Sequence, residues 1–216
     1  MARSISETTA WVAQIMREKR GVNDVDQVSN RSIRVSRDRY PPYVAGIIST
    51  WNVTDADVNA VLEEDPNVDI IINVPSAGVW QGSGIVTTRR AGVAFGGMGD
   101  LQSCIERENP SDYVKSEYEF IERGLSQHNR IQTIIREADR LFLLHRNGLP
   151  NIRVLALYEY ELTADHLRTA RARYGNFDLV LISNPNGRPT EGASDVAQTL
   201  GIELLMFREL LSRLNR

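Results

Sequence analysis

The stretch NFDLVLISNPNG, residues 176–187, has the pattern of a buried strand that ends in a polar turn. Residues 179–182 are all apolar, and the Asn-Pro-Asn-Gly sequence that soon follows them is typical of a turn. The stretch NVDIIINVPSAG, residues 67–78, repeats this pattern 109 positions earlier, with an Asn, an Asp and a Gly at matching places. The two stretches indicate that the chain contains two copies of one structural unit.

The offset of 109 residues, taken without gaps, also aligns the segments around these two strands, and Arg37, Pro41 and Gly78 are among the residues that recur. Each half is predicted to contain a helix, two strands around a proline turn, and then alternating helices and strands. Because such alternation favours parallel pairing, we predict an α/β fold. We predict that this fold is a tandem duplication of an α-β-β-α-β-α-β-α unit with largely parallel core strands, and that the domains are residues 1–108 and 109–216.

Several positions support matching helix boundaries in the two halves. Thr54 and Thr163 stand where an N-cap hydroxyl would accept the free amides of a following helix. Gly92 and Gly201 stand where a left-handed residue would end the next helix. The sequence therefore predicts corresponding helices at corresponding places.

The duplication makes a geometric prediction: residues 31–105 and 140–214 should superpose. Asp69 and Asp178 then stand at the start of equivalent buried strands, at the edge of the sheet opposite to the polar turns. We predict that both are structural, and that each accepts hydrogen bonds from a neighbouring segment or pairs with an arginine.

The composition is that of a globular protein, with 42% apolar and 25% charged residues among 216 and a net charge of −3. Cys104 is the only cysteine, which excludes an intrachain disulfide and a cysteine-based zinc site. No apolar run reaches membrane length. We expect a cytoplasmic protein without a membrane partner, and the sequence leaves open whether it forms a homo-oligomer or joins a larger complex.

The order of helix, hairpin, helix, strand, helix and strand over residues 113–216 resembles the restriction-endonuclease-like nucleases, especially their Mrr-type branch. The tail FDLVLISNPNGRPTEGASDVAQTLGIELLMFRELLSRL is similar to the strand, polar turn, small-residue helix, strand and last helix of that family. The first half shows the pattern more faintly. The resemblance implies a metal-dependent phosphodiesterase or nuclease, active or catalytically decayed, that acts on nucleic acid or nucleotides.

In that family, an Asp at the start of one hairpin strand and a Glu-x-Lys at the end of the next hold a divalent metal, often with a Glu from the preceding helix. The resemblance carries these roles to Asp139, Glu159 and Glu122. Asp139 and Glu159 would be the metal ligands, and Mg²⁺ or Mn²⁺ the cofactor. Glu161 stands at the lysine position, and this departure puts efficient cleavage in doubt.

The first half provides an internal comparison, because its residues at the four acidic positions are Ala13, Asn30, Thr50 and Asn52. The acidic group is therefore confined to the second half, as expected of a dedicated site. The alternative interpretation is structural, since YEYE, residues 158–161, also fits a half-exposed strand with alternating faces.

A second hypothesis places a ligand at the polar turns, because ligands of parallel α/β sheets bind outside the carboxyl ends of the strands. The candidate ligand-binding residues are Asn73, Ser76 and Trp80, Gly96 and Gly97 of the glycine-rich FGGMGD turn, and Asn184, Asn186, Arg188 and Thr190. Trp80 as a core residue and Thr190 as a simple N-cap are the structural alternatives. This hypothesis predicts a non-catalytic ligand-binding or complex-forming α/β protein.

Overall fold

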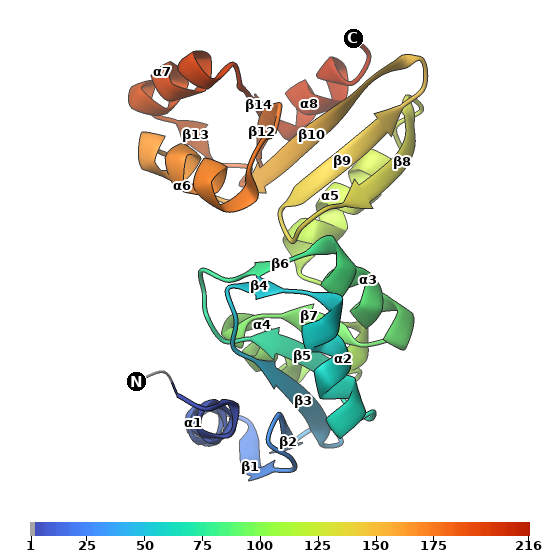
Figure 1. Cartoon of the computed structure of the whole chain (residues 1–216), viewed down its shortest axis with the longest axis vertical. Helices are drawn as coiled ribbons and strands as arrows, with labels where there is room; N and C mark the ends of the chain where they lie inside the picture. The colour runs from blue at the N-terminus through green and yellow to red at the C-terminus, as the bar shows by residue number, and fades with distance from the viewer. Residues whose placement is uncertain (1–2) are drawn as a thin grey trace. The chain divides into compact units, whose positions relative to one another are not determined.

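The computed structural model describes residues 3–216, which form eight α-helices and two five-stranded sheets of mixed direction (Figure 1). The chain divides into two compact units, with the boundary between Lys115 and Ser116. Each unit contains its own sheet and its own hydrophobic core. The predicted α/β class is confirmed. Across the described residues, no helix has the length and apolar character needed to span a bilayer.

The first unit contains one sheet in the order β1-β2-β3-β5-β7, in which β1 to β3 are antiparallel and β3, β5 and β7 are parallel. A short parallel pair, β4 with β6, lies outside this sheet. The elements are α1 (Ile5–Arg17), β1 (Val22–Gln27), β2 (Ser32–Arg37), β3 (Tyr43–Ile48), β4 (Asn52–Val53), α2 (Asp55–Glu64), β5 (Ile70–Asn73), β6 (Val79–Trp80), α3 (Gly82–Ala91), β7 (Ala94–Gly96), α4 (Met98–Ser103), and the 3-10 turns η1 (Cys104–Glu106) and η2 (Pro110–Asp112).

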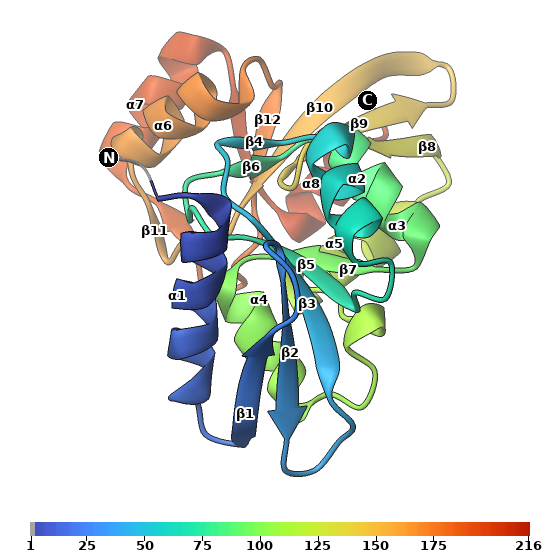
Figure 2. The ribbon, with the colours of Figure 1, turned by 60° about the horizontal axis from the view of Figure 1, so that its bottom comes forward.

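Helices cover both faces of the first sheet, which explains why its central strands are uninterrupted apolar runs. Along β5, Ile70 and Ile72 join a core cluster that includes Met16 of α1 and Leu101 of α4. Ile71 points the other way and joins a cluster with Val61 of α2. Figure 2 shows α1 alongside β1 and β2 in this unit.

The second unit has the corresponding strand order, β8-β9-β10-β12-β14, again with three antiparallel strands followed by parallel ones. The short pair here is β11 with β13. The elements are α5 (Ser116–Ser126), β8 (Ile131–Arg136), β9 (Leu141–Arg146), β10 (Leu149–Leu157), β11 (Glu161–Leu162), α6 (Ala164–Tyr174), β12 (Leu179–Ile182), β13 (Arg188–Pro189), α7 (Glu191–Leu200), β14 (Glu203–Met206) and α8 (Phe207–Arg213).

Strand pairing follows the same register in both units. Ala45 of β3 lies opposite Ile70 of β5, and Val154 of β10 lies opposite Leu179 of β12, each residue 109 positions after its counterpart. Helices α3 and α7 both end at a glycine in the left-handed conformation, with φ of 68° and 65°. The predicted caps at these two helix ends are therefore confirmed.

Asp69 and Asp178 each tie the start of one parallel strand to its neighbour. The Val44 amide donates to Asp69 Oδ2 at 2.8 Å, and the Arg153 amide donates to Asp178 Oδ2 at 2.7 Å. Both carboxylates thus accept a hydrogen bond from an adjacent strand, which is the structural role expected of them.

Two features of the predicted fold are corrected. The pairing is mixed rather than largely parallel, because each unit has an additional antiparallel edge strand, β1 or β8, that the sequence analysis missed. In β1 only Val25 is buried, so the strand lacks the apolar alternation by which strands are recognised. The second correction concerns the domain boundary, which was predicted after residue 108. Residues 109–115 belong to the first unit, where the Tyr113 hydroxyl donates to Asp100 Oδ1 at 2.6 Å.

Candidate functional site

Helix α5 and the turn between β8 and β9 bring a group of charged side chains together in the second unit. Arg136 Nη1 lies 3.0 Å from Glu122 Oε1, and Arg140 Nη1 lies 3.2 Å from Glu117 Oε1. Glu117 is buried, and it also accepts a hydrogen bond of 2.6 Å from the Ser183 hydroxyl at the end of β12. Glu122, predicted as a helper in metal binding, is therefore held by an arginine.

Asp139 lies in the same group, between the two arginines in the chain. Its carboxylate accepts hydrogen bonds from the Tyr174 hydroxyl and from the Arg140 amide, both at 3.1 Å. Burial raises the pKa of Asp139, and the positive charge of Arg140 opposes this shift. The group thus has the chemistry of a compact charge network that joins α5, the β8–β9 turn and the end of β12.

The raised pKa of Asp139 leads to a pH-dependent prediction. Because its pKa is raised by folding, protonation of Asp139 stabilises the folded state relative to the unfolded chain. This contribution is complete below the ordinary Asp pKa of about 3.9, and it is lost as pH rises through the higher folded-state pKa. At pH 7 the charged form is therefore disfavoured by burial. We expect Asp139→Asn to be as stable as the wild type or more stable at pH 7, and to flatten the stability profile between about pH 3.9 and the raised folded-state pKa.

Urea unfolding followed by circular dichroism across a pH series measures this effect. Asp195→Asn is the matched control, because Asp195 is an exposed carboxylate of the same unit. A marked loss of stability of Asp139→Asn at pH 7 would show instead that the arginines require the Asp139 charge.

The remaining acidic candidates lie after β10. Glu161 forms an exposed ion pair with Arg188, with 3.2 Å between Oε1 and Nη2, and Glu159 is half-buried in the preceding loop. No three His, Cys, Asp or Glu side chains within residues 3–216 are arranged to hold a metal ion. The structure therefore does not bring Glu122, Asp139 and Glu159 together as the group that was expected, and arginines accompany the carboxylates instead.

The polar-turn candidates of the first unit are mostly engaged in structural contacts. Asn73 is buried, and its side chain bonds both the amide and the carbonyl of Thr50, at 3.1 and 2.9 Å. Trp80 is a core residue whose indole donates to the Gly96 carbonyl at 3.1 Å. The Gly97 amide donates to Asp100 Oδ2 at 2.8 Å, so an acidic side chain occupies the glycine-rich turn. Ser76 is exposed.

In the second unit, Thr190 is the N-cap of α7 and accepts a hydrogen bond from Ala193, which is the structural alternative named above. Asn184 is buried and accepts a hydrogen bond from the Asn186 amide at 3.0 Å, but its Nδ2 has no acceptor within the described chain. Asn186 and Arg188 are exposed. These two residues, with Ser76, are the candidates that the fold leaves accessible.

Each sheet also has an exposed aromatic residue at its carboxyl edge, and the ligand-binding candidates predicted from sequence include neither of them. Trp51 follows β3 and is 69% exposed, and Tyr160 follows β10 and is 67% exposed. The Val79 amide donates to the Trp51 carbonyl at 2.8 Å, and the Arg188 amide donates to the Tyr160 carbonyl at 3.0 Å. The offset of 109 residues aligns Trp51 with Tyr160, and this aromatic match was a usable signal.

Both aromatic residues stand on loops that are packed closely against a polar turn. A Cβ atom added at Gly78 would lie 2.8 Å from the Thr50 carbonyl, and one at Gly187 would lie 2.5 Å from the Glu159 carbonyl. Only glycine allows this approach. We call Trp51 and Tyr160, each with its adjoining turn, the aromatic edges of the two units.

Hydrogen-bonding side chains lie next to each aromatic residue. Beside Trp51, the Gln81 amide group donates to Asn52 Oδ1 at 3.1 Å on the surface. Beside Tyr160 lies the exposed Glu161–Arg188 pair, together with Tyr158, which is 46% exposed. Each aromatic edge therefore combines a flat apolar face with polar groups, a combination that can contact a planar polar ligand.

Comparison with protein-family models, with curated proteins and with solved structures finds no match to this chain.

Proposed function

We propose that this protein is a non-catalytic binding protein that holds single-stranded nucleic acid or nucleotides at the aromatic edges of its two units. The observation that carries the proposal is the pair of aromatic side chains, Trp51 and Tyr160, each about two-thirds exposed at equivalent positions. Exposed aromatic rings can stack on bases, and each such contact contributes about 1–3 kcal/mol. The polar groups beside them can bond base edges or sugar hydroxyls.

The charge of the protein bears on the affinity. A net charge of −3 gives little general attraction for phosphate backbones, so stacking must supply most of the binding free energy. We therefore expect modest affinity and only a weak dependence on salt.

We also propose that the two units arose by tandem duplication. They have the same strand order, and the pairing registers agree at a constant offset of 109 residues. A further parallel supports this origin, because Arg37 and Arg146 make matching contacts. Their Nη1 atoms donate to the Arg107 and Arg216 carbonyls at 2.5 and 2.6 Å.

Fluorescence anisotropy with a short labelled oligothymidylate tests the binding proposal. We expect Trp51→Ala and Tyr160→Ala each to weaken binding by about 5- to 150-fold, the equivalent of about 1–3 kcal/mol. Phe120→Ala is the matched control, since Phe120 is a 58% exposed aromatic residue on α5, outside both aromatic edges. Equal affinity of all three variants and the wild type would contradict the proposal.

The alternative is the metal-dependent phosphodiesterase that the resemblance implies. It is favoured by the concentration of Glu117, Glu122 and Asp139 in the second unit, where the first unit has Thr8, Ala13 and Asn30. The same samples distinguish the two functions when Mn²⁺ or Mg²⁺ is added. Two results would favour the enzyme over the binding protein: cleavage of the oligonucleotide, and thermal stabilisation by the metal that is lost in Asp139→Ala.

A further inference from the structure

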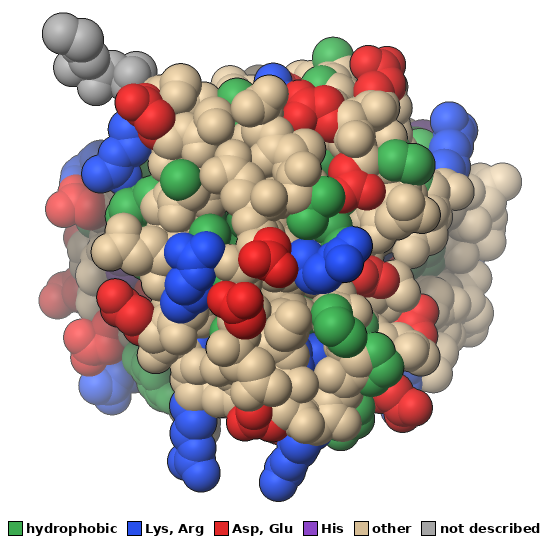
Figure 3. Space-filling model, turned by 90° about the horizontal axis from the view of Figure 1, so that it is seen from below, with side chains coloured by type: hydrophobic (Ala, Val, Ile, Leu, Met, Phe, Trp, Pro, Cys, Tyr) green, Lys and Arg blue, Asp and Glu red, His purple; other side chains and the backbone are tan. Residues whose placement is uncertain are grey.

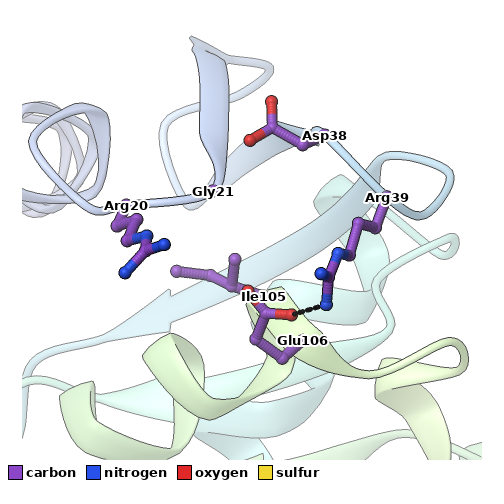
Figure 4. Close-up of a pocket in the computed structure, with 6 residues that line it drawn as sticks. All are labelled: Arg20, Gly21, Asp38, Arg39, Ile105 and Glu106. Carbon is purple, nitrogen blue, oxygen red and sulfur yellow. Dashed lines mark ion pairs between the residues drawn. The ribbon is translucent and has the colours of Figure 1, made fainter.

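A charged pocket of about 410 Å³ lies in the first unit, away from the aromatic edge. It is lined by Arg20, Gly21, Asp38, Arg39, Ile105 and Glu106. These residues come from the α1–β1 connection, the β2–β3 turn and η1, so they surround the amino-terminal ends of β1 and β3. Figure 4 shows Arg20 and Arg39 extending toward Ile105 and Glu106 from opposite sides.

A buried arginine fixes the wall of this pocket. Arg37 Nη1 donates to the Cys104 carbonyl at 2.8 Å, and its Nε donates to the Pro41 carbonyl at 2.9 Å. These bonds hold η1, which carries Ile105 and Glu106, against the β2–β3 turn. Two of the segments that line the pocket are therefore joined by a buried side chain.

Gly21 shapes the opposite wall. Its φ of 83° is a conformation that favours glycine. An added Cβ would lie 3.2 Å from Ile105 Cγ2 and 3.3 Å from Glu106 Oε1, so a larger residue would intrude on the pocket.

The pocket contains two positive and two negative side chains, which interact only weakly with one another. Arg39 and Glu106 form an ion pair of 3.6 Å whose side chains are 77% and 61% exposed, and such pairs contribute little (Figure 4). Arg20 and Asp38 are also exposed. Figure 3 shows positive and negative side chains interspersed on the face that it views. In the pocket itself, two arginines lie with two carboxylates, which suits a ligand that carries both an anionic group and hydrogen-bond donors.

The second unit lacks this set of charges. Its residues at the positions of Arg20, Asp38, Arg39 and Glu106 are Asn129, Asn147, Gly148 and Asn215. The buried arginine that fixes the wall is kept as Arg146, so the supporting structure is common to both units while the charged lining belongs to the first unit alone. A lining that only stabilised the fold would be expected in both units.

We propose that this pocket binds a small hydroxylated organic anion. Arg20 and Arg39 hold its phosphate or carboxylate group, since guanidinium groups form strong paired hydrogen bonds with such anions. Asp38 and Glu106 accept hydrogen bonds from its hydroxyl groups, and Ile105 contacts its carbon chain. The volume lies within the range of small-molecule sites. This site is separate from the aromatic edges and does not depend on their function.

Isothermal titration calorimetry on the full chain tests the proposal with four probes: glycerol 3-phosphate, glycerate, inorganic phosphate and glycerol. We expect one of the two hydroxylated anions to bind more tightly than inorganic phosphate, and glycerol not to bind. A preference for glycerol 3-phosphate identifies a phosphate ester as the ligand class, and a preference for glycerate identifies a hydroxy acid.

Variants of the lining residues test whether the anion binds in this pocket. Arg20→Ala and Arg39→Ala should each weaken it by at least about tenfold, because each removes a charge-assisted contact. Arg34→Ala is the matched control, since Arg34 is an exposed arginine of β2 that does not line the pocket. Thermal unfolding confirms that each variant folds. No binding of either hydroxylated anion, or equal losses in Arg34→Ala and Arg20→Ala, would overturn the proposal.

Discussion

Replacing Glu117 by Ala is expected to lower the free energy of unfolding of the second unit by about 3–5 kcal/mol. Glu117 is buried and accepts from both Arg140 and Ser183. The variant would leave the half-buried Arg140 cation without this counter-charge and the Ser183 hydroxyl without this acceptor. Removing one member of a buried charge pair is destabilising because the other remains desolvated.

The positions of the tryptophans allow this effect to be assigned to one unit. All three, Trp11, Trp51 and Trp80, belong to the first unit, so their fluorescence follows its unfolding, whereas far-ultraviolet circular dichroism follows both units. In Glu117→Ala we expect part of the dichroism signal to be lost at lower urea concentration while the fluorescence midpoint stays unchanged. Glu119→Ala, an exposed neighbour on the same helix, is the control. An unshifted dichroism curve for Glu117→Ala would contradict the expectation.

Replacing Arg37 or Arg146, the two buried arginines at matching positions of the units, should lower the free energy of unfolding by about 2–4 kcal/mol. Each bonds several backbone carbonyls, and hydrogen bonds to a charged group contribute about 1.5–3 kcal/mol. Arg37 bonds Pro41 and Cys104, and Arg146 bonds Pro150 and Leu214. Arg37 connects its hairpin to η1, and Arg146 connects its hairpin to the end of α8.

The two arginine variants should act on different signals. We expect Arg37→Ala to lower the fluorescence midpoint, and Arg146→Ala to lower the dichroism midpoint while leaving fluorescence unchanged. Similar losses at the two positions are expected if the units share one architecture. Arg34→Ala controls for the removal of an exposed arginine. A decrease in the free energy of unfolding below about 0.5 kcal/mol, the usual range for surface substitutions, would show that these contacts do not stabilise the unit that contains them.

The sequence predicted the central strands well because burial on both faces leaves an uninterrupted apolar run, as in β5 and β12. It also located the ends of α3 and α7, because a left-handed cap requires a residue such as glycine. The edge strands escaped detection for the opposite reason. With one buried residue in six, β1 has almost no apolar pattern to recognise.

The candidate sites depend on distant parts of the chain, and local sequence does not determine their geometry. The pairing of Glu117 with Arg140 spans 23 residues and that with Ser183 spans 66, so neither is visible as a motif. For the same reason, acidic residues that match a metal-binding pattern in sequence are accompanied by arginines in space. The exposure of Trp51 and the contribution of Ile105 to a pocket likewise follow from tertiary packing.

The two outer strands missed from sequence differ in how they resist self-association. Unpaired backbone groups at a sheet edge can recruit a strand from another chain, and charged side chains along the edge oppose this. Strand β1 has exposed Asp24 and Asp26, whereas β8 presents Gln132, Thr133 and Ile135 on its exposed positions. In the first unit, the charged side chains of β1 therefore oppose the addition of a strand from another chain. In the second unit, the exposed positions of β8 carry no charge, so another chain would extend the sheet more readily there.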